Sequence, residues 1–366
     1  SGMLSSRHVE ELTKMAEVSN ARILFFGDDK QVEAVDAGRP FAQLIEGGVK
    51  HVELGEIRRT KNKKLLGAIY NVIGDEIDKA FEKIKGNIVQ EKGYMKRLHT
   101  AVDLYFKKGA ESTLFLTPAN DDRHMANALI RERMISEGKI KNRDFIGVLE
   151  NKDVRQVAML KQSTYEINDV VRLGFTSKKH GFVRGEYFRV VQSGSGGIGI
   201  KSLADDAKKI NLSMVEMSEF RKGSVELYRV VQYEVGEGDK LRWKRSDKDL
   251  GVVNGQSVTV DKVGRDKITV VSEDGKKTSF KKDDVRFKHV DYAYADTSYS
   301  AQGQTSDNAV LLLDSKRRNL VNKKSTYVGL SRARHDAFVI TDDSERLLQA
   351  VSGRAGENST AIANTR

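Results

Sequence analysis

The stretch that decides the fold reads Tyr327-Val328-Gly329-Leu330-Ser331-Arg332-Ala333-Arg334, and the apolar run Ala337-Phe338-Val339-Ile340 follows it. The first segment has the small and hydroxylated residues of a closely packed helix that carries two arginines. The second has no charge in its core, which is typical of a strand buried in a parallel sheet. An arginine beside such a sheet pairs with a structural carboxylate or binds a phosphate, because its rigid fork suits both. For a single arginine the structural role is the commoner one, so other segments of the chain must show whether these arginines bind phosphate.

Composition sets broad bounds on the protein. The chain has 366 residues, with 63 Lys+Arg against 52 Asp+Glu and a formal net charge of +11. The length predicts two or three domains, and the basic excess favours polyanionic partners without establishing them. The absence of cysteine excludes disulfides and thiolate metal sites, and we expect no metal ligands. No apolar run reaches the roughly 20 residues of a membrane span, and no signal-peptide pattern is present. We therefore expect a cytoplasmic protein.

Strands and helices alternate in the first 150 residues. The apolar segment 22–26 predicts a strand, and the polar segment 27–31 follows at its carboxyl end, where open α/β sheets bind ligands. Amphipathic helices come next, and a second strand at 112–116 leads into a long helix that Asn120 can cap. This alternation predicts an α/β fold with a doubly wound sheet.

The pattern changes after about residue 150, where short β-rich segments predominate. The Gly/Ser-rich segment 193–199 is interpreted as a flexible linker, because Ile200 stands where a phosphate-binding P-loop requires lysine. From 240 to 287, short strands separated by turns such as Asn254-Gly255 predict a small β-barrel. The apolar strand 309–313 then restores the parallel-sheet pattern.

Four segments with polar and basic residues follow one another in a fixed order: Gly27 to Gln31, Glu56 to Arg59, Tyr294 to Gly303, and Tyr327 to Arg334. Together they resemble motifs III, IV, V and VI of superfamily 1B DNA helicases, the RecD-like group that includes the helicase part of conjugative relaxases. Further matches at 37–41 and 238–247 extend the resemblance over most of the chain and look closest to the relaxase-helicases. The resemblance implies a RecA-like core, made of a partial first lobe and a second lobe, with an inserted SH3-like barrel.

The resemblance also implies roles for individual residues. Gln31 would sense the nucleotide γ-phosphate and couple the two lobes, while Arg59 and Arg332 would stabilise charge on the transferring phosphoryl group. Residues implied in nucleotide binding are Gly27, Asp28, Lys30, Gln302 and Gly303. Residues implied in DNA binding are Thr297, Tyr299 and Arg334. Relatives commonly carry His at the position of Tyr299, so no chemistry is assigned to its phenol, and Arg334 is undecided between DNA contact and packing.

A basic groove with an aromatic platform is what sequence-independent binding of single-stranded DNA requires. The only tryptophan of the chain is Trp243, and four cations flank it: Lys240, Arg242, Lys244 and Arg245. This segment predicts such a groove. The alternative is that Trp243 belongs to the core of the barrel, and the sequence leaves this open.

The P-loop lysine and the Asp-Glu pair of a complete helicase are both missing before motif III. Residues 1–4 resemble the sequence that directly follows Asp-Glu in this family, so we expect a fragment that begins just after the Walker B motif. ATP and Mg²⁺ would then bind only to the intact parent, and this chain, which lacks the parent's N-terminal half, would be inactive as an ATPase.

Three functions are compatible with these observations. The first is a C-terminal helicase fragment of a conjugative relaxase whose parent translocates 5′ to 3′ on single-stranded DNA and is itself transferred to a recipient cell. The second is a non-catalytic module that binds single-stranded DNA or a type IV secretion coupling protein as a translocation signal. The third is a RecD-like recombination or repair helicase. The predicted domains are lobe 1A at 1–92, lobe 2A at 93–150 and 291–345, a β-rich insertion at 151–239, the SH3-like 2B barrel at 240–290 and a tail at 346–366.

Overall fold

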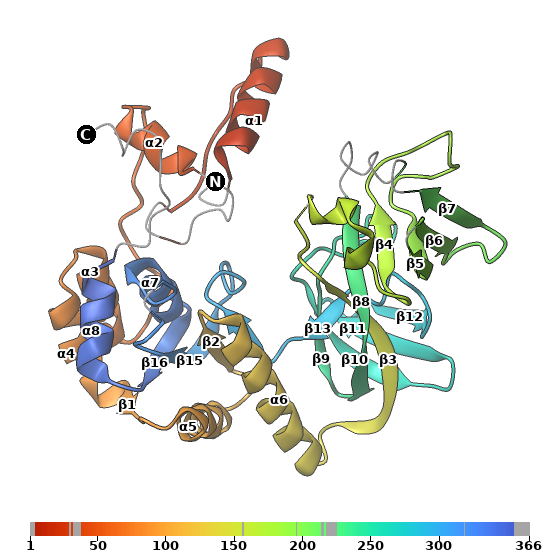
Figure 1. The fold of residues 1–366 in the computed structure, drawn as a ribbon. Helices are drawn as coiled ribbons and strands as arrows, with labels where there is room; N and C mark the ends of the chain where they lie inside the picture. The colour runs from red at the N-terminus through yellow and green to blue at the C-terminus, as the bar shows by residue number, and fades with distance from the viewer. Residues whose placement is uncertain are drawn as a thin grey trace. The chain divides into compact units, whose positions relative to one another are not determined.

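The computed structural model describes residues 4–28, 31, 38–155, 157–194, 196–213, 216, 225–317 and 319–354. The chain forms two compact units (Figure 1). Ser1–Arg133 and Tyr294–Arg366 make up the first unit, and Met134–Ala293 makes up the second.

A five-stranded parallel sheet forms the centre of the first unit. The order of its strands is β1-β16-β15-β2-β14, and every neighbouring pair is parallel. Residues 337–340 lie inside β16, which has a partner strand on each side, and the predicted buried parallel strand is therefore confirmed. The strand order reverses between β15 and β2, which is the switch point of the sheet. The strands are β1 (Ile88–Gln90), β2 (Thr113–Thr117), β14 (Ala295–Thr297), β15 (Ser306–Leu313) and β16 (Ala333–Thr341).

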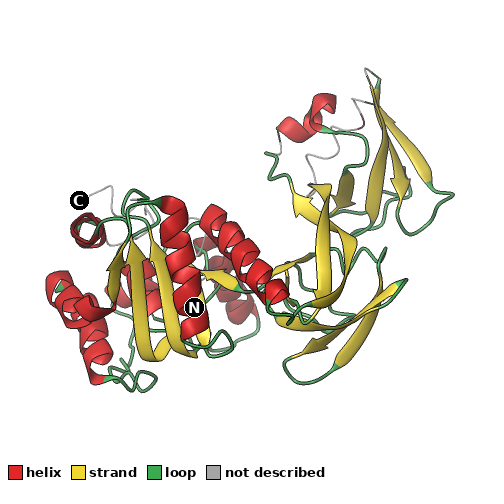
Figure 2. Ribbon diagram, turned by 90° about the horizontal axis from the view of Figure 1, so that it is seen from below, coloured by secondary structure: helices red, strands yellow, loops and turns green. Residues whose placement is uncertain are grey.

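Helices cover both faces of this sheet (Figure 2). Successive side chains of β15 point to opposite faces of the sheet. Leu311 and Leu313 point to the same face and belong to the apolar cluster formed with α3, α4, α7 and α8. On the opposite face, Tyr105 of α5 packs edge-on against Phe115 of β2. Helix α6 follows β2, and Asn127 on this helix accepts hydrogen bonds from the backbone N–H groups that lead into β14. The helices are α3 (Lys63–Ile73), α4 (Ile77–Ile84), α5 (Tyr94–Lys107), α6 (Asn120–Ser136), α7 (Lys323–Leu330) and α8 (Ser344–Ser352), with the 3₁₀ turn η1 (Lys85–Asn87).

The predicted strand at residues 22–26 is wrong. The described residues before 58 contain only α1 (Ser6–Val18) and α2 (Pro40–Glu46), and residues 21–28 form neither a helix nor a strand. Leu24 and Phe26 are 79% and 77% exposed. A strand is stable only when its backbone pairs and its apolar side chains are covered, and no described segment provides either.

Two antiparallel sheets form the second unit. The six-stranded sheet has the order β3-β8-β4-β5-β6-β7, and the five-stranded sheet has the order β12-β11-β10-β9-β13. Mixed α/β architecture with separate antiparallel β-rich parts is what the sequence predicted. The elements are β3 (Lys141–Asn151), η2 (Ala158–Leu160), η3 (Gln162–Thr164), β4 (Val170–Leu173), β5 (Tyr187–Gly194), β6 (Gly197–Ser202), β7 (Lys209–Ser213), β8 (Val225–Glu237), β9 (Lys240–Trp243), β10 (Ser257–Val263), β11 (Lys267–Ser272), β12 (Lys277–Lys281) and β13 (Val290–Tyr292).

The interpretation of residues 193–199 as a flexible linker is also wrong. Ser193 pairs with Ile198, and Gly194 pairs with Gly197, so the segment is the tip of the β5–β6 hairpin. Gly197 has a positive φ of 132°, and a Cβ there would collide with the carbonyl oxygen of Leu212 on β7. Glycine at this position therefore allows β6 to pair closely with β7, and it is not a sign of a flexible segment.

The second unit contains the same five-stranded arrangement twice. Strands β7-β6-β5-β4-β8 have the same order as β12-β11-β10-β9-β13. The isolated bridge Ser177↔Phe182 of the first set recurs 70 positions later as Asp247↔Val252, and a bulge follows both Val190 and Val260. We call residues 169–228 the first barrel and residues 239–292 the second barrel.

Cross-strand partners repeat as well. Arg172 lies opposite Glu226 in the first barrel, and Arg242 lies opposite Asp291 in the second. The second barrel thus resembles part of the segment predicted as a separate β-rich insertion. The predicted residue ranges of the domains stay predictions, although β1 shares a sheet with β16, so the predicted boundary at 92 does not coincide with a break in this core.

Candidate functional site

Arg332 lies at the junction between α7 and β16 and is only 2% exposed. Its Nε donates to the carbonyl of Val328 (3.1 Å), and its Nη2 donates to Ser331 Oγ (3.2 Å) and to Gln31 Oε1 (3.5 Å). Among the described residues, no carboxylate lies within ion-pair distance of this guanidinium. Burial and the positive charge of Arg59 together lower the pKa of Arg332 to about 10, while Tyr327 and the charge of Asp28 oppose the shift. A buried cation without an acidic partner suits an anionic ligand.

Arg59 contributes a second cation to the same place. Its Nη1 donates to the carbonyl of Ser331 (2.9 Å), next to Arg332 in the chain. Partial burial lowers the pKa of Arg59, as does the charge of Arg334. Two guanidinium groups from segments far apart in the sequence therefore meet at one turn of backbone.

Gln31 joins these arginines to the segment that precedes it and to motif V. Its Nε2 donates to Asp28 Oδ2 (2.8 Å), and its Oε1 accepts from Gln302 Nε2 (3.2 Å). The Oε1 atom of Gln302 is buried and has no hydrogen-bond partner. The adjacent Gly303 has a φ of 91°, a left-handed conformation that favours glycine. The structure thus brings Gln31, Gln302 and Arg332 together as the resemblance implied.

Tyr327 is a member of this cluster to which sequence reasoning gave no role. Its phenol donates to Asp28 Oδ2 (2.9 Å), and burial together with the charge of Asp28 raises the pKa of Tyr327. The signal in the sequence was its place one helical turn before Ser331, in the same segment as Arg332. Of the other motif III residues, Gly27 is exposed, and Lys30 lies outside the described residues.

Thr297 lies at the carboxyl end of β14, directly opposite Thr117 of β2. Its hydroxyl group is 2.9 Å from Ser300 Oγ, so the side chain also closes the following turn. Tyr299 in this turn is half-buried. Arg334 is exposed, and its Nη1 forms an ion pair with Asp307 (3.2 Å), which supports the packing role.

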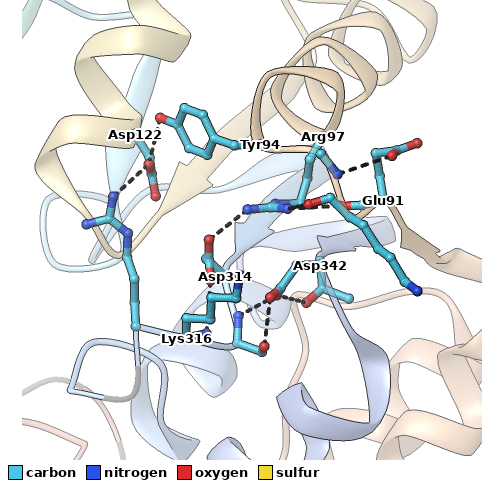
Figure 3. Close-up of polar contacts among 12 residues, drawn as sticks. Glu91, Tyr94, Arg97, Asp122, Asp314, Lys316 and Asp342 are labelled. Atoms are coloured by element: carbon cyan, nitrogen blue, oxygen red, sulfur yellow. Dashed lines mark hydrogen bonds and ion pairs between the residues drawn. The ribbon is translucent and has the colours of Figure 1, made fainter.

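The crevice at the switch point is filled by the protein's own charged side chains (Figure 3). Arg97 is 3% exposed, and its Nη2 donates to Asp314 Oδ2 (2.7 Å), just beyond the end of β15. Asp122 is 2% exposed and accepts hydrogen bonds from Tyr94 Oη (3.0 Å) and Arg317 Nη2 (3.1 Å). Because these charges are paired, we interpret the cluster as structural.

The aromatic platform predicted at Trp243 is wrong, because the indole is 1% exposed. It packs edge-on against Phe280 and Phe287 in the core of the second barrel. Strand alternation places Leu241 and Trp243 on the inner face of β9, whereas Lys244 is exposed. Trp243 therefore cannot stack on a nucleic-acid base in this structure.

The cations around Trp243 do not form one open groove either. Arg245 Nη1 donates to Glu226 Oε2 (2.8 Å), and the same oxygen accepts from Arg172 Nη1 (3.0 Å). Arg242 is 7% exposed. Lys244 is 4.0 Å from Asp291, and Lys240 is half-buried.

No group of three or more His, Cys, Asp or Glu residues is placed to hold a metal ion in the part of the chain that the structure describes. In the same residues, no helix is long and apolar enough to cross a membrane.

The parallel sheet and the antiparallel β-rich parts are typical of one class of fold, a RecA-like lobe combined with β-rich subdomains. Comparison with known proteins agrees with this class. Residues 1–90 match a family described as AAA domain. Together with the similarity to TraI given below, this match confirms the resemblance to RecD-like superfamily 1B helicases.

Among individual proteins, the chain is a distant relative of the multifunctional conjugation protein TraI of Escherichia coli, with 24% identity over 402 residues. TraI of E. coli strain K12 is 23% identical. Each match covers 96% of this chain, and the chain spans 22% of the length of these relatives. Solved Pif1 helicase structures are also similar: one at forked DNA has 13% identity and a TM-score of 0.47, covering all of this chain and 71% of that one. Bacteroides Pif1 bound to single-stranded DNA has 12% identity and a TM-score of 0.38, covering 100% of this chain and 72% of its own.

Proposed function

We propose that this chain supplies one wall of the ATP site of a conjugative DNA helicase that translocates 5′ to 3′ on single-stranded DNA in the complete enzyme. The observation that supports this most directly is the meeting of Arg332 and Arg59 at Ser331, where no carboxylate of the described residues lies at ion-pair distance from Arg332. Phosphoryl transfer creates negative charge that such a pair stabilises when a nucleotide is bound.

The side chains of this cluster have separable tasks. Arg332 and Arg59 would stabilise charge on the terminal phosphate, and Gln31 would report its presence through Gln302 to the DNA-binding turn that contains Thr297. The hydrogen bonds Gln302 to Gln31 and Gln31 to Asp28 provide this connection. When ATP and Mg²⁺ are bound by the complete enzyme, they supply the reacting phosphate and its charge neutralisation.

The 366-residue chain alone is proposed to be inactive as an ATPase. Its sequence contains no Gly-Lys-Ser or Gly-Lys-Thr, and a P-loop lysine with its hydroxyl neighbour is needed to bind phosphate and Mg²⁺. The residues present fit the γ-phosphate side of a nucleotide site, and the described residues include no group of three or more His, Cys, Asp or Glu placed to hold a metal ion.

An ATPase assay with and without single-stranded DNA tests this proposal. We expect no turnover by the 366-residue chain and DNA-stimulated turnover by the parent protein that contains this sequence. In the parent, Arg332→Ala should lower kcat by about 10³-fold or more, the scale of an arginine finger. Arg346→Ala on exposed α8 is the matched control and should leave kcat unchanged. Robust turnover by the isolated chain would contradict the proposal.

A translocation-signal module is the second candidate function. The observation that favours it is that Met134–Ala293 forms a compact unit of its own, as a recognition module would. Its partner would be a type IV secretion coupling protein, and pull-down of such a protein by this unit is the test. The similarity to TraI over 96% of the chain favours both candidates over a recombination or repair helicase.

A further inference from the structure

Three cations stand in one row across the first barrel. Arg189 on β5 is the register partner of Lys201 on β6, and Lys201 is the register partner of Lys209 on β7. Directly opposite residues of antiparallel strands point to the same face. Phe188 and Ile200, their neighbours along the strands, are buried in the barrel core. The three cations, which we call the basic row, therefore lie on the outer face.

The basic row is unfavourable for the fold by itself. Like charges directly opposite each other destabilise an antiparallel pair, and neighbouring strands are only about 4.8 Å apart. The duplicated barrel shows that the fold does not require them. The equivalent row of the second barrel is Thr259, Val271 and Lys277, matched through the same strand register. It holds a single cation, and Lys277 is paired with Asp261 (2.8 Å).

One carboxylate shows that the basic row attracts anions. Asp206, in the turn between β6 and β7, is within 2.7 Å of Lys201 Nζ although its side chain is 93% exposed. Its pKa is lowered by the hydrogen bond and charge of Lys201, and further by the charges of Arg189 and Lys209. Within the described part of the chain, neither Arg189 nor Lys209 has an ion-pair partner, so this one acid is set against three cations.

A fourth cation adds positive charge near Arg189. Lys288 is half-buried, and its pKa is lowered by burial and by the charge of Arg189. Asp283 and Asp284 oppose this effect at Lys288, and Asp284 is paired with Arg286 (2.7 Å).

We propose that the basic row of the first barrel binds the phosphate backbone of single-stranded DNA. A phosphate chain crossing the strands supplies repeated negative charge to a row of evenly spaced cations, which relieves their mutual repulsion and displaces the weak contact of Asp206. No aromatic side chain is required, so the contact does not distinguish one base from another. This inference rests on the proposed function, in that the DNA is the strand on which the helicase acts.

The test compares two variants of the whole chain with the same change in net charge. One carries Arg189→Gln, Lys201→Gln and Lys209→Gln; the control carries Lys83→Gln, Lys85→Gln and Lys107→Gln on exposed positions of the first unit. Fluorescence anisotropy of labelled oligo(dT) gives affinity as a function of salt. We expect the row variant to bind at least about tenfold more weakly at low salt, and its log–log salt slope to be smaller by about 2, since each lost phosphate contact contributes roughly 0.7. The control should keep the slope of the unaltered chain.

Further measurements separate the possible failures. Urea unfolding should show that the row variant is at least as stable as the unaltered chain, because it removes a repulsion; a large loss of stability would overturn the inference. If the row variant keeps the affinity and salt slope of the unaltered chain while Thr297→Ala binds more weakly, the basic row does not bind the DNA. The proposed helicase function would then still hold. If the row variant binds more weakly and Thr297→Ala has no effect, the result supports DNA binding by the basic row. It also counts against a role of motif V in DNA binding. Absence of oligo(dT) binding by the unaltered chain, or tighter binding to duplex DNA only, overturns the inference as well.

Discussion

At the residue scale, the environment of a side chain decides what its chemistry can do. Arg332 and Arg97 are both buried arginines beside the same sheet. Arg97 donates to the carboxylate of Asp314 and is satisfied within the protein, whereas Arg332 contacts carbonyl, hydroxyl and amide oxygens. The sequence cannot distinguish these cases, because the partner of each arginine lies far away along the chain.

Trp243 gives the first prediction at this scale. Trp243→Ala should destabilise the second barrel by about 3–5 kcal/mol, because it leaves a cavity between Phe280 and Phe287. Equilibrium urea unfolding measures this loss. Trp243→Phe keeps an aromatic ring in the core and should leave the affinity for oligo(dT) unchanged. A tenfold loss of affinity in this folded variant would restore the role of Trp243 as a stacking platform.

His289 predicts a pH dependence of stability. The imidazole is 4% exposed, and its Nε2 is 2.8 Å from the phenol oxygen of Tyr187. Burial, together with the charges of Arg245 and Arg172, lowers the pKa of His289 to about 4, while Glu226 opposes the shift. The unfolded chain, with an ordinary His pKa near 6.5, binds a proton that the folded chain does not accept. The free energy of unfolding should therefore fall as the pH decreases from about 6.5 to 4, by roughly 3 kcal/mol at most.

Urea unfolding at a series of pH values tests this dependence. His289→Gln should flatten the decrease between pH 6.5 and 4, because the buried imidazole is gone. His335→Gln, at an exposed position of β16, is the control and should retain it. Equal pH profiles for His289→Gln and the unaltered chain would refute the assignment.

At the element scale, close packing of α7 on β15 positions Arg332. Gly329 lies where the helix contacts the sheet, and a Cβ at this position would collide with Leu311 Cδ2. The glycine therefore lets the helix end close to the strand, so that Ser331 and Arg332 form a buried turn between α7 and β16. The sequence showed a small residue here, but only the packing explains why it is small.

Gly329→Ala should destabilise the first unit by about 1–3 kcal/mol, the usual cost of overpacking. Gly67→Ala on α3 is the matched control. A Cβ there would be 3.3 Å from the flexible end of Lys83, and a helical Gly→Ala change without a clash is stabilising by up to about 1 kcal/mol. Thermal unfolding should thus give melting temperatures that change in opposite directions. Similar shifts for both variants would mean that the contact with Leu311 is not tight.

At the scale of the whole molecule, each of the main apolar clusters lies within one of the two units. The cluster around the parallel sheet draws on residues 65–84, 116 and 301–351, whereas the two main clusters of the second unit lie within residues 146–290. The second unit is also continuous in sequence, from Met134 to Ala293. These properties are those of an independently folding domain.

The fragment Met134–Ala293, expressed alone, should fold. We expect a β-rich circular dichroism spectrum, cooperative thermal unfolding and protection of Trp243 from fluorescence quenchers. Noncooperative unfolding with strong dye binding would show that the fragment depends on the first unit. The control is the thermal unfolding curve of the 366-residue chain under the same conditions, which should contain the transition of the second unit.

The sequence by itself determined the features that depend on neighbouring residues and on motif order. These include the alternation of strands and helices, the parallel strand at 337–340 and the resemblance to RecD-like superfamily 1B helicases. It failed at residues 22–26 and 193–199, because an apolar run becomes a strand only when a partner covers it, and a Gly-rich segment becomes a tight hairpin when another strand lies against it.

Only the tertiary structure decided which charges are free and which are paired. It buried Trp243, joined Arg245 to Glu226, and brought Tyr327 to Asp28 across almost the whole chain. It also revealed the repeated barrel, whose two copies share strand register more than residue identity. The physical reason is that periodicity and turn chemistry act over a few residues, whereas burial and ion pairing depend on partners that folding brings together from distant parts of the sequence.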